Sequence, residues 1–183
     1  MGKTPTTETA TLSGGCFWCT EAIFRRLNGV VSVNPGYSGG TVPHPTYEQV
    51  VTGRTGHAEA IQIVFDPGII SFDTLLDVFF TLHDPTTMNR QGADVGTQYR
   101  SAVFYHTEEQ RRKAADTIRS LEASGTYKKI VTEVAAFTAF YPAEDYHKRY
   151  YEKNSYAPYC QVVIDPKISK LMAGFSKLVK RDA

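Results

Sequence analysis

The chain has 183 residues, 42% of them apolar, and this length and composition predict one domain with a substantial core. Twenty Lys and Arg residues balance 19 Asp and Glu residues, so we expect no basic face of the kind that binds nucleic acid. Three cysteines are too few, and odd in number, for a disulfide-stapled secreted fold, which favours reduced thiols in the cytoplasm. We expect no secretion signal, because the first ten residues lack the apolar region of a signal peptide, and no membrane helix, because no segment approaches the roughly 18 consecutive apolar residues that one needs.

The predicted elements alternate between strands and helices. We expect residues 1–9 to form a disordered Thr-rich arm and residues 10–183 to form a single domain. Apolar spacing predicts strands over 10–13, 30–33, 57–65, 101–105 and 130–136, and helices over 17–27, 71–84, 107–124, 143–153 and 167–180. Ser71 and Thr107 are expected to cap two helices, and Gly125 to end the second. Residues 34–40 are rich in turn-forming types, and the long loop 84–100 suggests function. This order favours an α/β (α+β) fold in which helices flank one mixed sheet.

The stretch "TLSGGCFWCTEAIF", residues 11–24, contains two of the three cysteines and the only tryptophan. Cys16 follows two glycines where the predicted strand gives way to a helix. The unpaired N–H groups and the positive dipole at a helix N-terminus stabilise a thiolate, so we expect Cys16 to be reactive, ionised and reachable. A cysteine that only fills space in the core is the alternative interpretation.

Cys19 gives a Cys-x-x-Cys spacing, which is found in zinc sites and in redox dithiols. A zinc site is not favoured because the chain has neither a second cysteine pair nor a His-x₃₋₅-His pattern. A thioredoxin-like dithiol is the stronger alternative. Against it, Phe17 and Trp18 are bulky apolar neighbours, more typical of the walls of a small apolar pocket. Phe17 can equally be a core residue of the helix.

Glu59 alternates with Ile61, Ile63 and Phe65, so it is expected on the core-facing side of its strand. A buried carboxyl group is either paired with a cation or protonated through a raised pKa, and a protonated one can act as a general acid. A structural ion pair is the alternative. The loop up to Arg100 and the turn before Tyr47 add further hydrogen-bonding groups that can orient a polarised oxygen.

Six blocks carry a resemblance to a known family. They are "GGCFWCTE" at 14–21, "GYSGG" at 36–40, "PTYEQV" at 45–50, "TGHAEAIQIVFDP" at 55–67, "HDPTT" with "RQGADVGTQYRS" up to residue 101, and "AEDYH" at 143–147. In this order they resemble the peptide-methionine (S)-S-oxide reductases, the methionine sulfoxide reductase A family, over about residues 10–167. The resemblance implies a ferredoxin-like two-layer plait.

The resemblance also implies roles for single residues. It makes Cys16 the nucleophile and Glu59 the acid that protonates the sulfoxide oxygen. The other site residues that it implies line the pocket for the substrate's S-methyl group (Phe17, Trp18), hydrogen-bond the oxygen (Tyr47, Tyr99) or order the site (Asp94). The implied reaction reduces free and protein-bound methionine (S)-sulfoxide through a cysteine sulfenic acid and a disulfide, in the repair of oxidised proteins. We expect thioredoxin as reductant, no cofactor or metal, and a monomer.

The chain departs from the family pattern at the resolving cysteine. Many members have Gly where this chain has Cys19, and this chain also has Cys160 in a Tyr-, Asn- and Pro-bearing segment that we expect to move. Cys160 is favoured as the thiol that condenses with the sulfenic acid, because a disulfide between Cys16 and Cys19 would strain the first helical turn. Two other functional classes stay open: a dithiol redox partner that uses Cys16 and Cys19, and a non-catalytic binder of oxidised methionine.

Overall fold

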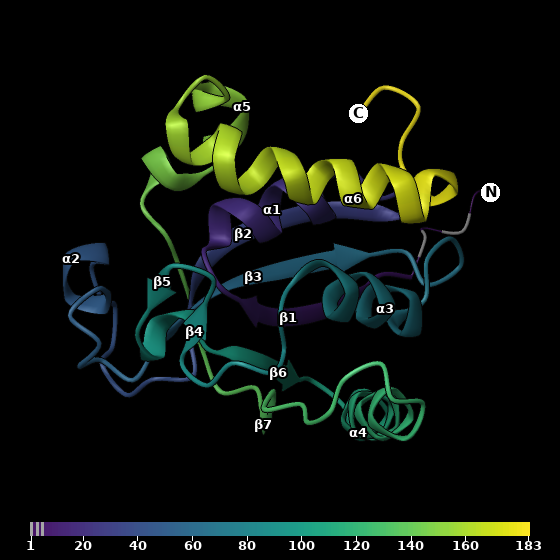
Figure 1. Cartoon of the computed structure of the whole chain (residues 1–183), viewed down its shortest axis with the longest axis horizontal. Helices are drawn as coiled ribbons and strands as arrows, with labels where there is room; N and C mark the ends of the chain where they lie inside the picture. Colours follow the sequence, from purple (N-terminus) through teal and green to yellow (C-terminus); the bar gives the residue numbers. More distant parts are fainter. Residues whose placement is uncertain (1, 3, 5) are drawn as a thin grey trace.

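The computed structural model describes residues 2, 4 and 6–183 and is built around a six-stranded mixed sheet (Figure 1). Its strand order is β7-β6-β1-β3-β2-β8. The strands are β1 (Glu8–Gly14), β2 (Val30–Ser38), β3 (Ala58–Phe65), β6 (Ser101–Tyr105), β7 (Glu133–Ala136) and β8 (Phe140–Pro142). Neighbouring strands are antiparallel except β6 and β7, which are parallel. The expected mixed sheet flanked by helices is thereby confirmed.

Helices cover the sheet, and short helical turns connect several of its strands. The α-helices are α1 (Phe17–Phe24), α2 (Tyr47–Val50), α3 (Phe72–Leu82), α4 (Glu108–Ala123), α5 (Tyr150–Asn154) and α6 (Asp165–Phe175). The expected caps are present: Ser71 accepts a hydrogen bond from the Thr74 N–H, and Thr107 accepts one from the Gln110 N–H. In Figure 1, α6 runs along the same side of the sheet as α1, and the two helices are in contact.

The main core lies between the sheet and the helices α1, α3 and α6. The side chains of Ile61, Ile63 and Phe65 on β3 are fully buried in this core, against Phe17 and Phe24 of α1 among others. Because side chains alternate across a strand, Glu59 shares the side of β3 that faces this core. Burial of the apolar side chains holds the start of α1 against β3, and this contact positions the candidate site.

The strand β2 continues through residues 34–38, where the sequence predicted a turn. The ladder between β2 and β8 ends at Gly36, and Pro35 lies just beyond this end. On this side Pro35 accepts a hydrogen bond from the Ala143 N–H through its carbonyl group and needs no N–H of its own, so proline is tolerated. A Cβ atom at Gly36 would lie 2.4 Å from the Tyr141 carbonyl oxygen. Glycine and proline here permit close backbone pairing, so the turn prediction was wrong for these residues.

Other expected boundaries also differ from the structure. The first helix ends at Phe24, the strand expected over 130–136 begins only at Glu133, and β8 was not predicted. The helix expected over 143–153 is divided into a 3₁₀ turn (Asp145–His147) and α5, and the last helix is preceded by a π-helical turn (Cys160–Ile164). The loop 84–100 contains a small hairpin of β4 (Arg90–Gln91) and β5 (Asp94–Val95), followed by a 3₁₀ turn (Thr97–Tyr99).

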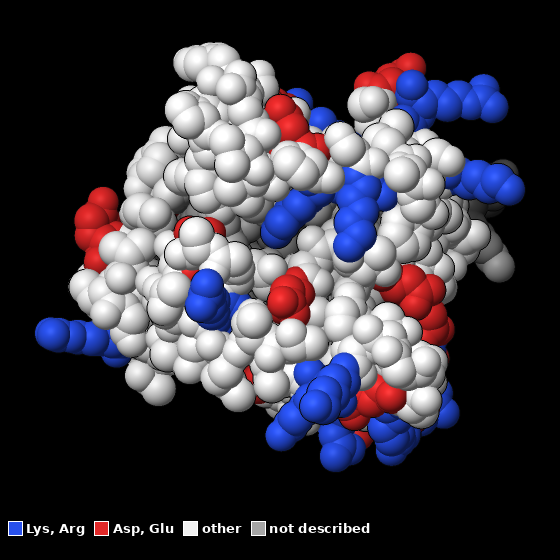
Figure 2. Space-filling model, in the orientation of Figure 1, with Lys and Arg blue, Asp and Glu red and all other residues white. Residues whose placement is uncertain are grey.

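The strand β1 begins at Glu8, so residues 8 and 9 belong to the sheet and not to the expected N-terminal arm. Residues 1, 3 and 5 of that arm lie outside the described residues. Within the described part of the chain, no helix combines the length and the apolar character needed to cross a membrane. The visible face carries Lys and Arg over α4 and α6 and is mostly uncharged around α5 (Figure 2).

Candidate active site

Cys16 is the residue that joins the central strand β1 to the N-terminus of α1. It precedes the first residue of α1, and the Cys19 N–H donates to its carbonyl oxygen at 3.1 Å. Gly15 has a φ of +90°, and a Cβ atom there would lie 2.6 Å from the Gln91 side chain, so only glycine fits this turn. The connection therefore fixes the Cys16 side chain at the helix N-terminus, as the sequence predicted.

The Cys16 side chain is buried, with 8% of the residue exposed, whereas the sequence analysis expected a reachable thiolate. Burial raises the pKa of the Cys16 thiol well above its ordinary value, and the hydrogen bond with Cys19 and the charge of Glu59 raise it further. The Trp18 N–H opposes this shift without reversing it. The burial of Cys16 contradicts the expectation of a reachable thiol, and it opposes ionisation of the sulfur in this state.

Glu59 lies in the middle of the sheet on β3, and 2% of it is exposed. Its Oε1 atom accepts a hydrogen bond of 3.1 Å from the Phe17 N–H, the first amide of α1. Burial raises the pKa of Glu59 to about 8, although the hydrogen bond from Phe17 acts in the opposite direction. The carboxyl group is therefore mostly protonated at neutral pH, in the burial state that the strand pattern predicted.

Trp18 lies half-buried beside Cys16, and its ring is covered by other aromatic side chains. It stacks on Tyr150, with ring centroids 3.6 Å apart, and meets the edge of Tyr159 at 5.7 Å. Its indole Nε1–H donates to His147 Nδ1 at 3.0 Å. Phe17 is 1% exposed and belongs to the main core. The chain's own tyrosines thus occupy the apolar face that Trp18 would offer to a ligand.

Tyr47 and Tyr99 approach the same buried region from two separate helical segments, α2 and the 3₁₀ turn at 97–99. Tyr47 is the first residue of α2, and burial followed by the charges of Glu59 and Cys16 raises its pKa to about 12. Burial and the charge of Glu59 also raise the pKa of Tyr99. Both hydroxyl groups are consequently protonated hydrogen-bond donors at neutral pH.

Asp94 on β5 is connected to the cysteines through Tyr159. The Tyr159 hydroxyl donates to Asp94 Oδ2 at 2.8 Å and lies 3.8 Å from Cys19 Sγ. Tyr159 immediately precedes Cys160, so this contact fixes the segment that carries the third cysteine over the site. We call this contact, Tyr159 with Asp94 and Cys19, the Tyr159 lid.

All three cysteines are free thiols, and they belong to one buried cluster. Cys19 and Cys160 are 1% and 0% exposed. Cys160 lies in the π-helical turn before α6, and burial followed by the charge of Cys19 raises its pKa. Both candidate resolving thiols are therefore close to Cys16 in the fold.

The model of one protein family, described as peptide methionine sulfoxide reductase, matches residues 8–178. The chain belongs to this family. Among the curated relatives is a peptide methionine sulfoxide reductase MsrA of Saccharolobus solfataricus, 59% identical over 94% of this chain and 97% of the relative. The MsrA of Sulfolobus acidocaldarius is 60% identical over 92% of this chain and 95% of that protein. The crystal structure of Mxr1 from Saccharomyces cerevisiae in its reduced form is similar to this chain with a TM-score of 0.78 and 34% sequence identity, and the match covers 87% of this chain and 92% of Mxr1.

Two features of the site were not predicted from the sequence. Glu144 accepts hydrogen bonds of 3.1 Å from the Tyr37 hydroxyl and from the Tyr47 N–H, and so fixes the start of α2 beside the site. Tyr159 forms the lid. Glu144 lies in the "AEDYH" block and Tyr159 in the tyrosine-dense region after Tyr141, but no local spacing connects either residue to Cys16.

Proposed function

We propose that the chain reduces methionine (S)-sulfoxide, free and in proteins, to methionine, with Cys16 as the residue that takes the oxygen. The observation that carries this proposal is the pairing of a cysteine with a protonated carboxyl group at one helix N-terminus. Glu59 binds the Phe17 N–H at 3.1 Å, directly after Cys16, and its pKa is raised to about 8. Family membership supports the same reaction.

The sulfur of a sulfoxide is electrophilic, but its oxygen leaves only when it is protonated. In the proposed step, Glu59 gives its proton to that oxygen while the Cys16 sulfur attacks, and the hydroxyl group ends on Cys16 as a sulfenic acid. Methionine leaves with the electron pair of the broken S–O bond, and a proton from solvent, equivalent to the one that Cys16 loses on ionising, restores Glu59. The Tyr47 and Tyr99 hydroxyls support the oxygen, and Asp94 orders the site.

Substrate entry requires the Tyr159 lid to open, because Tyr150 and Tyr159 cover Trp18 in this structure. Opening would let Trp18, with Phe17 behind it, contact the S-methyl group. It would also expose Cys16 to water and remove the main cause of its raised pKa, burial. The nucleophile would then ionise when the site is open to substrate.

We propose Cys160 as the thiol that condenses with the sulfenic acid, which forms a Cys16–Cys160 disulfide and releases water. Its place in the same buried cluster supports this role, and its segment is separate from α1 and can approach without distorting the first helical turn. Cys19 stays the alternative. Thioredoxin is the proposed reductant of the disulfide; the yeast relative Mxr1 has also been solved in complex with Trx2.

We further propose that the inner four strands form a ferredoxin-like plait within one catalytic domain, which the start of β1 at Glu8 extends from the expected residues 10–183 to residues 8–183. Their order β6-β1-β3-β2 and the placement of α1 and α3 between strands support this β-α-β-β-α-β arrangement. Free thiols suit a reducing compartment, so we place the protein in the cytoplasm, where it would repair oxidised proteins as a monomer.

The proposed function is tested by measuring methionine formed from methionine (S)-sulfoxide with dithiothreitol as reductant. Wild-type protein should turn over, and Cys16→Ser should form no methionine. A dithiol redox partner predicts that Cys19→Ser loses this activity while Cys160→Ser keeps it. A non-catalytic binder predicts stoichiometric binding of the sulfoxide without turnover, and unchanged binding by Cys16→Ser.

A further inference from the structure

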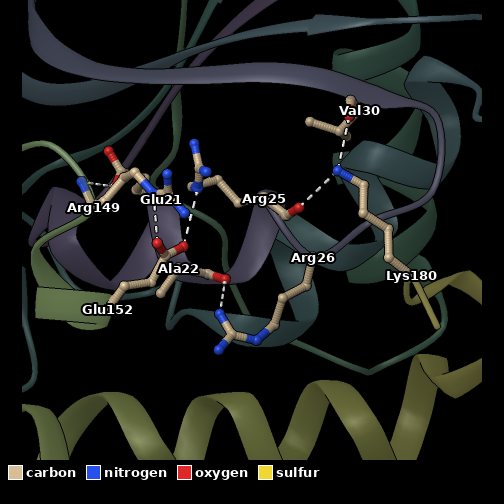
Figure 3. A network of polar contacts seen from close by, with 8 residues as sticks. All are labelled: Glu21, Ala22, Arg25, Arg26, Val30, Arg149, Glu152 and Lys180. Carbon is tan, nitrogen blue, oxygen red and sulfur yellow. Dashed lines mark hydrogen bonds and ion pairs between the residues drawn. The ribbon is translucent and has the colours of Figure 1, made fainter. Parts of the chain in front are cut away.

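Glu21 is a buried carboxyl group that the proposed reaction does not use. It lies on α1, beyond Cys16 and Cys19, and only 3% of it is exposed. One carboxylate oxygen, Oε1, accepts a hydrogen bond from the backbone N–H of Arg149, and the other, Oε2, has no hydrogen-bond partner among the described residues (Figure 3). A buried carboxyl group costs stability unless its contacts offset the loss of water.

Arg149 forms a bend in the chain directly before α5. Its φ of +56° and ψ of +36° lie in the left-handed region, which is strained for a residue with a side chain. Its guanidinium group binds Glu152 on the next turn, and Glu152 also pairs with Arg25 (Figure 3). The Glu21 carboxyl group therefore binds the backbone N–H of Arg149, at the left-handed bend that joins the 3₁₀ turn at 145–147 to α5.

The segment after this bend carries the residues that cover and resolve the site. Tyr150, the next residue, stacks on Trp18, and the chain then continues through α5 to Tyr159 and Cys160. Glu21 thus connects the helix that begins at the nucleophile to the start of the segment that carries the resolving thiol.

The charged groups around Glu21 leave its protonation balanced near neutral pH. Burial raises its pKa to about 7, against the hydrogen bond from the Arg149 N–H and the charge of Arg25 on α1. From α5, Glu152 raises the pKa further and Lys153 lowers it. The ionised carboxylate is the stronger hydrogen-bond acceptor, so it holds the Arg149 N–H more firmly than the acid does.

We propose that Glu21 is a positioning residue for disulfide formation: its carboxyl group holds the bend at Arg149, so that Cys160 reaches the oxidised Cys16. This inference rests on the proposed function and concerns only its second step. In that step the Cys160 sulfur bonds to the Cys16 sulfur, the S–O bond of the sulfenic acid breaks, and the hydroxyl group leaves as water with the proton of Cys160. Glu21 contacts the bend and not the sulfoxide, so the first step does not depend on it.

The test separates the two steps by rapid quenching after one equivalent of methionine sulfoxide is added without reductant. Methionine reports the first step, and the loss of two thiols reports the disulfide. In Glu21→Ala, methionine should form within about twofold of the wild-type rate, while disulfide formation slows about 10-fold or more, as expected for loss of a buried charge-assisted hydrogen bond. Glu152→Gln, which weakens the surface pairs with Arg25 and Arg149 but keeps the hydrogen bond from the Arg149 N–H to Glu21, is the matched control and should change neither step more than about twofold.

Glu21→Gln tests the role of the charge through the pH dependence of disulfide formation, which a merely structural role of Glu21 would not change. Its amide oxygen still accepts from the Arg149 N–H, so its disulfide rate should match wild type at pH 6, where Glu21 is mostly protonated. The ratio of the wild-type rate to the Gln rate should then rise about threefold or more between pH 6 and 8, as Glu21 ionises. Ionisation of Cys160 is common to both proteins and cancels in the ratio.

Wild-type disulfide rates in Glu21→Ala, or a pH-independent ratio for Glu21→Gln, would overturn the role of Glu21. The Gln series decides the matter if the Ala protein does not fold. Failure of the proposed function itself looks different, because then the wild-type protein forms no methionine in the first step.

Discussion

Replacing Glu59 by Gln removes the proposed acid while keeping the acceptor for the Phe17 N–H. At pH 7 a carboxyl group with a pKa of about 8 is about nine-tenths protonated, so wild type has its acid in place. The amide cannot give up a proton in the same way, and general acids typically contribute about 10²- to 10⁴-fold in rate. We expect turnover of methionine sulfoxide at pH 7 to fall by that factor, with little change in circular dichroism.

The same substitution should change how stability depends on pH. The pKa of Glu59 rises from 4.5 to about 8, and each pH unit corresponds to about 1.4 kcal/mol, so ionised Glu59 costs the folded state up to about 5 kcal/mol. The pKa of Glu59 is higher in the folded than in the unfolded state. The contribution of Glu59 to the free energy of unfolding is therefore most favourable below pH 4.5 and is lost as the pH rises through about 8. The Gln variant avoids this loss, so its relative free energy of unfolding should increase from pH 5 to pH 9.

Urea unfolding at pH 5, 7 and 9, together with initial rates at pH 7, measures both effects. Glu109→Gln, which removes an exposed carboxylate on α4, is the control and should match wild type in both. Wild-type turnover in Glu59→Gln, or a stability difference that stays constant between pH 5 and 9, would refute the reasoning about this carboxyl group.

Three further substitutions test the lid, the aromatic wall and the resolving thiol. Tyr159→Phe removes the 2.8 Å hydrogen bond from the Tyr159 hydroxyl to Asp94, so the rate at which iodoacetamide alkylates Cys16 should increase about fivefold or more. An unchanged rate would exclude a gating role for that bond. Trp18→Phe removes the 3.0 Å hydrogen bond to His147, so the free energy of unfolding measured in urea should fall by about 1–3 kcal/mol and the KM for methionine sulfoxide should rise. No change in either quantity would contradict the assigned contacts. Cys160→Ser should keep dithiothreitol-dependent turnover within about twofold but lose turnover with thioredoxin. Cys19→Ser should keep turnover with both reductants. The reverse pattern would make Cys19 the resolving thiol.

Local patterns were enough to predict much of the frame around the site. The alternation of Glu59 with Ile61 and Ile63 predicted which side of β3 faces the core, and Ser71 and Thr107 predicted two helix starts. Each of these features depends on interactions within a few residues. They could therefore be predicted without knowledge of the contacts between distant segments.

The features that local patterns did not predict depend on contacts between segments far apart in the chain. Pro35 and Gly36 are typical turn residues, yet they lie in a strand because β3 and β8 flank them. The bend at Arg149 is held by Glu21, and the lid is held by Asp94. Burial in the folded chain also raises the pKa of Cys16 although this residue begins a helix, and local sequence does not reveal that burial.

The central claim is that Cys16 takes the oxygen and Cys160 then joins it. Mass spectrometry of peptides from the protein, after one equivalent of methionine (S)-sulfoxide without reductant, tests this claim most directly. We predict one equivalent of methionine and a disulfide-linked peptide pair that contains Cys16 and Cys160. Formation of methionine with Cys16 still a free thiol, or no methionine at all, would contradict the account.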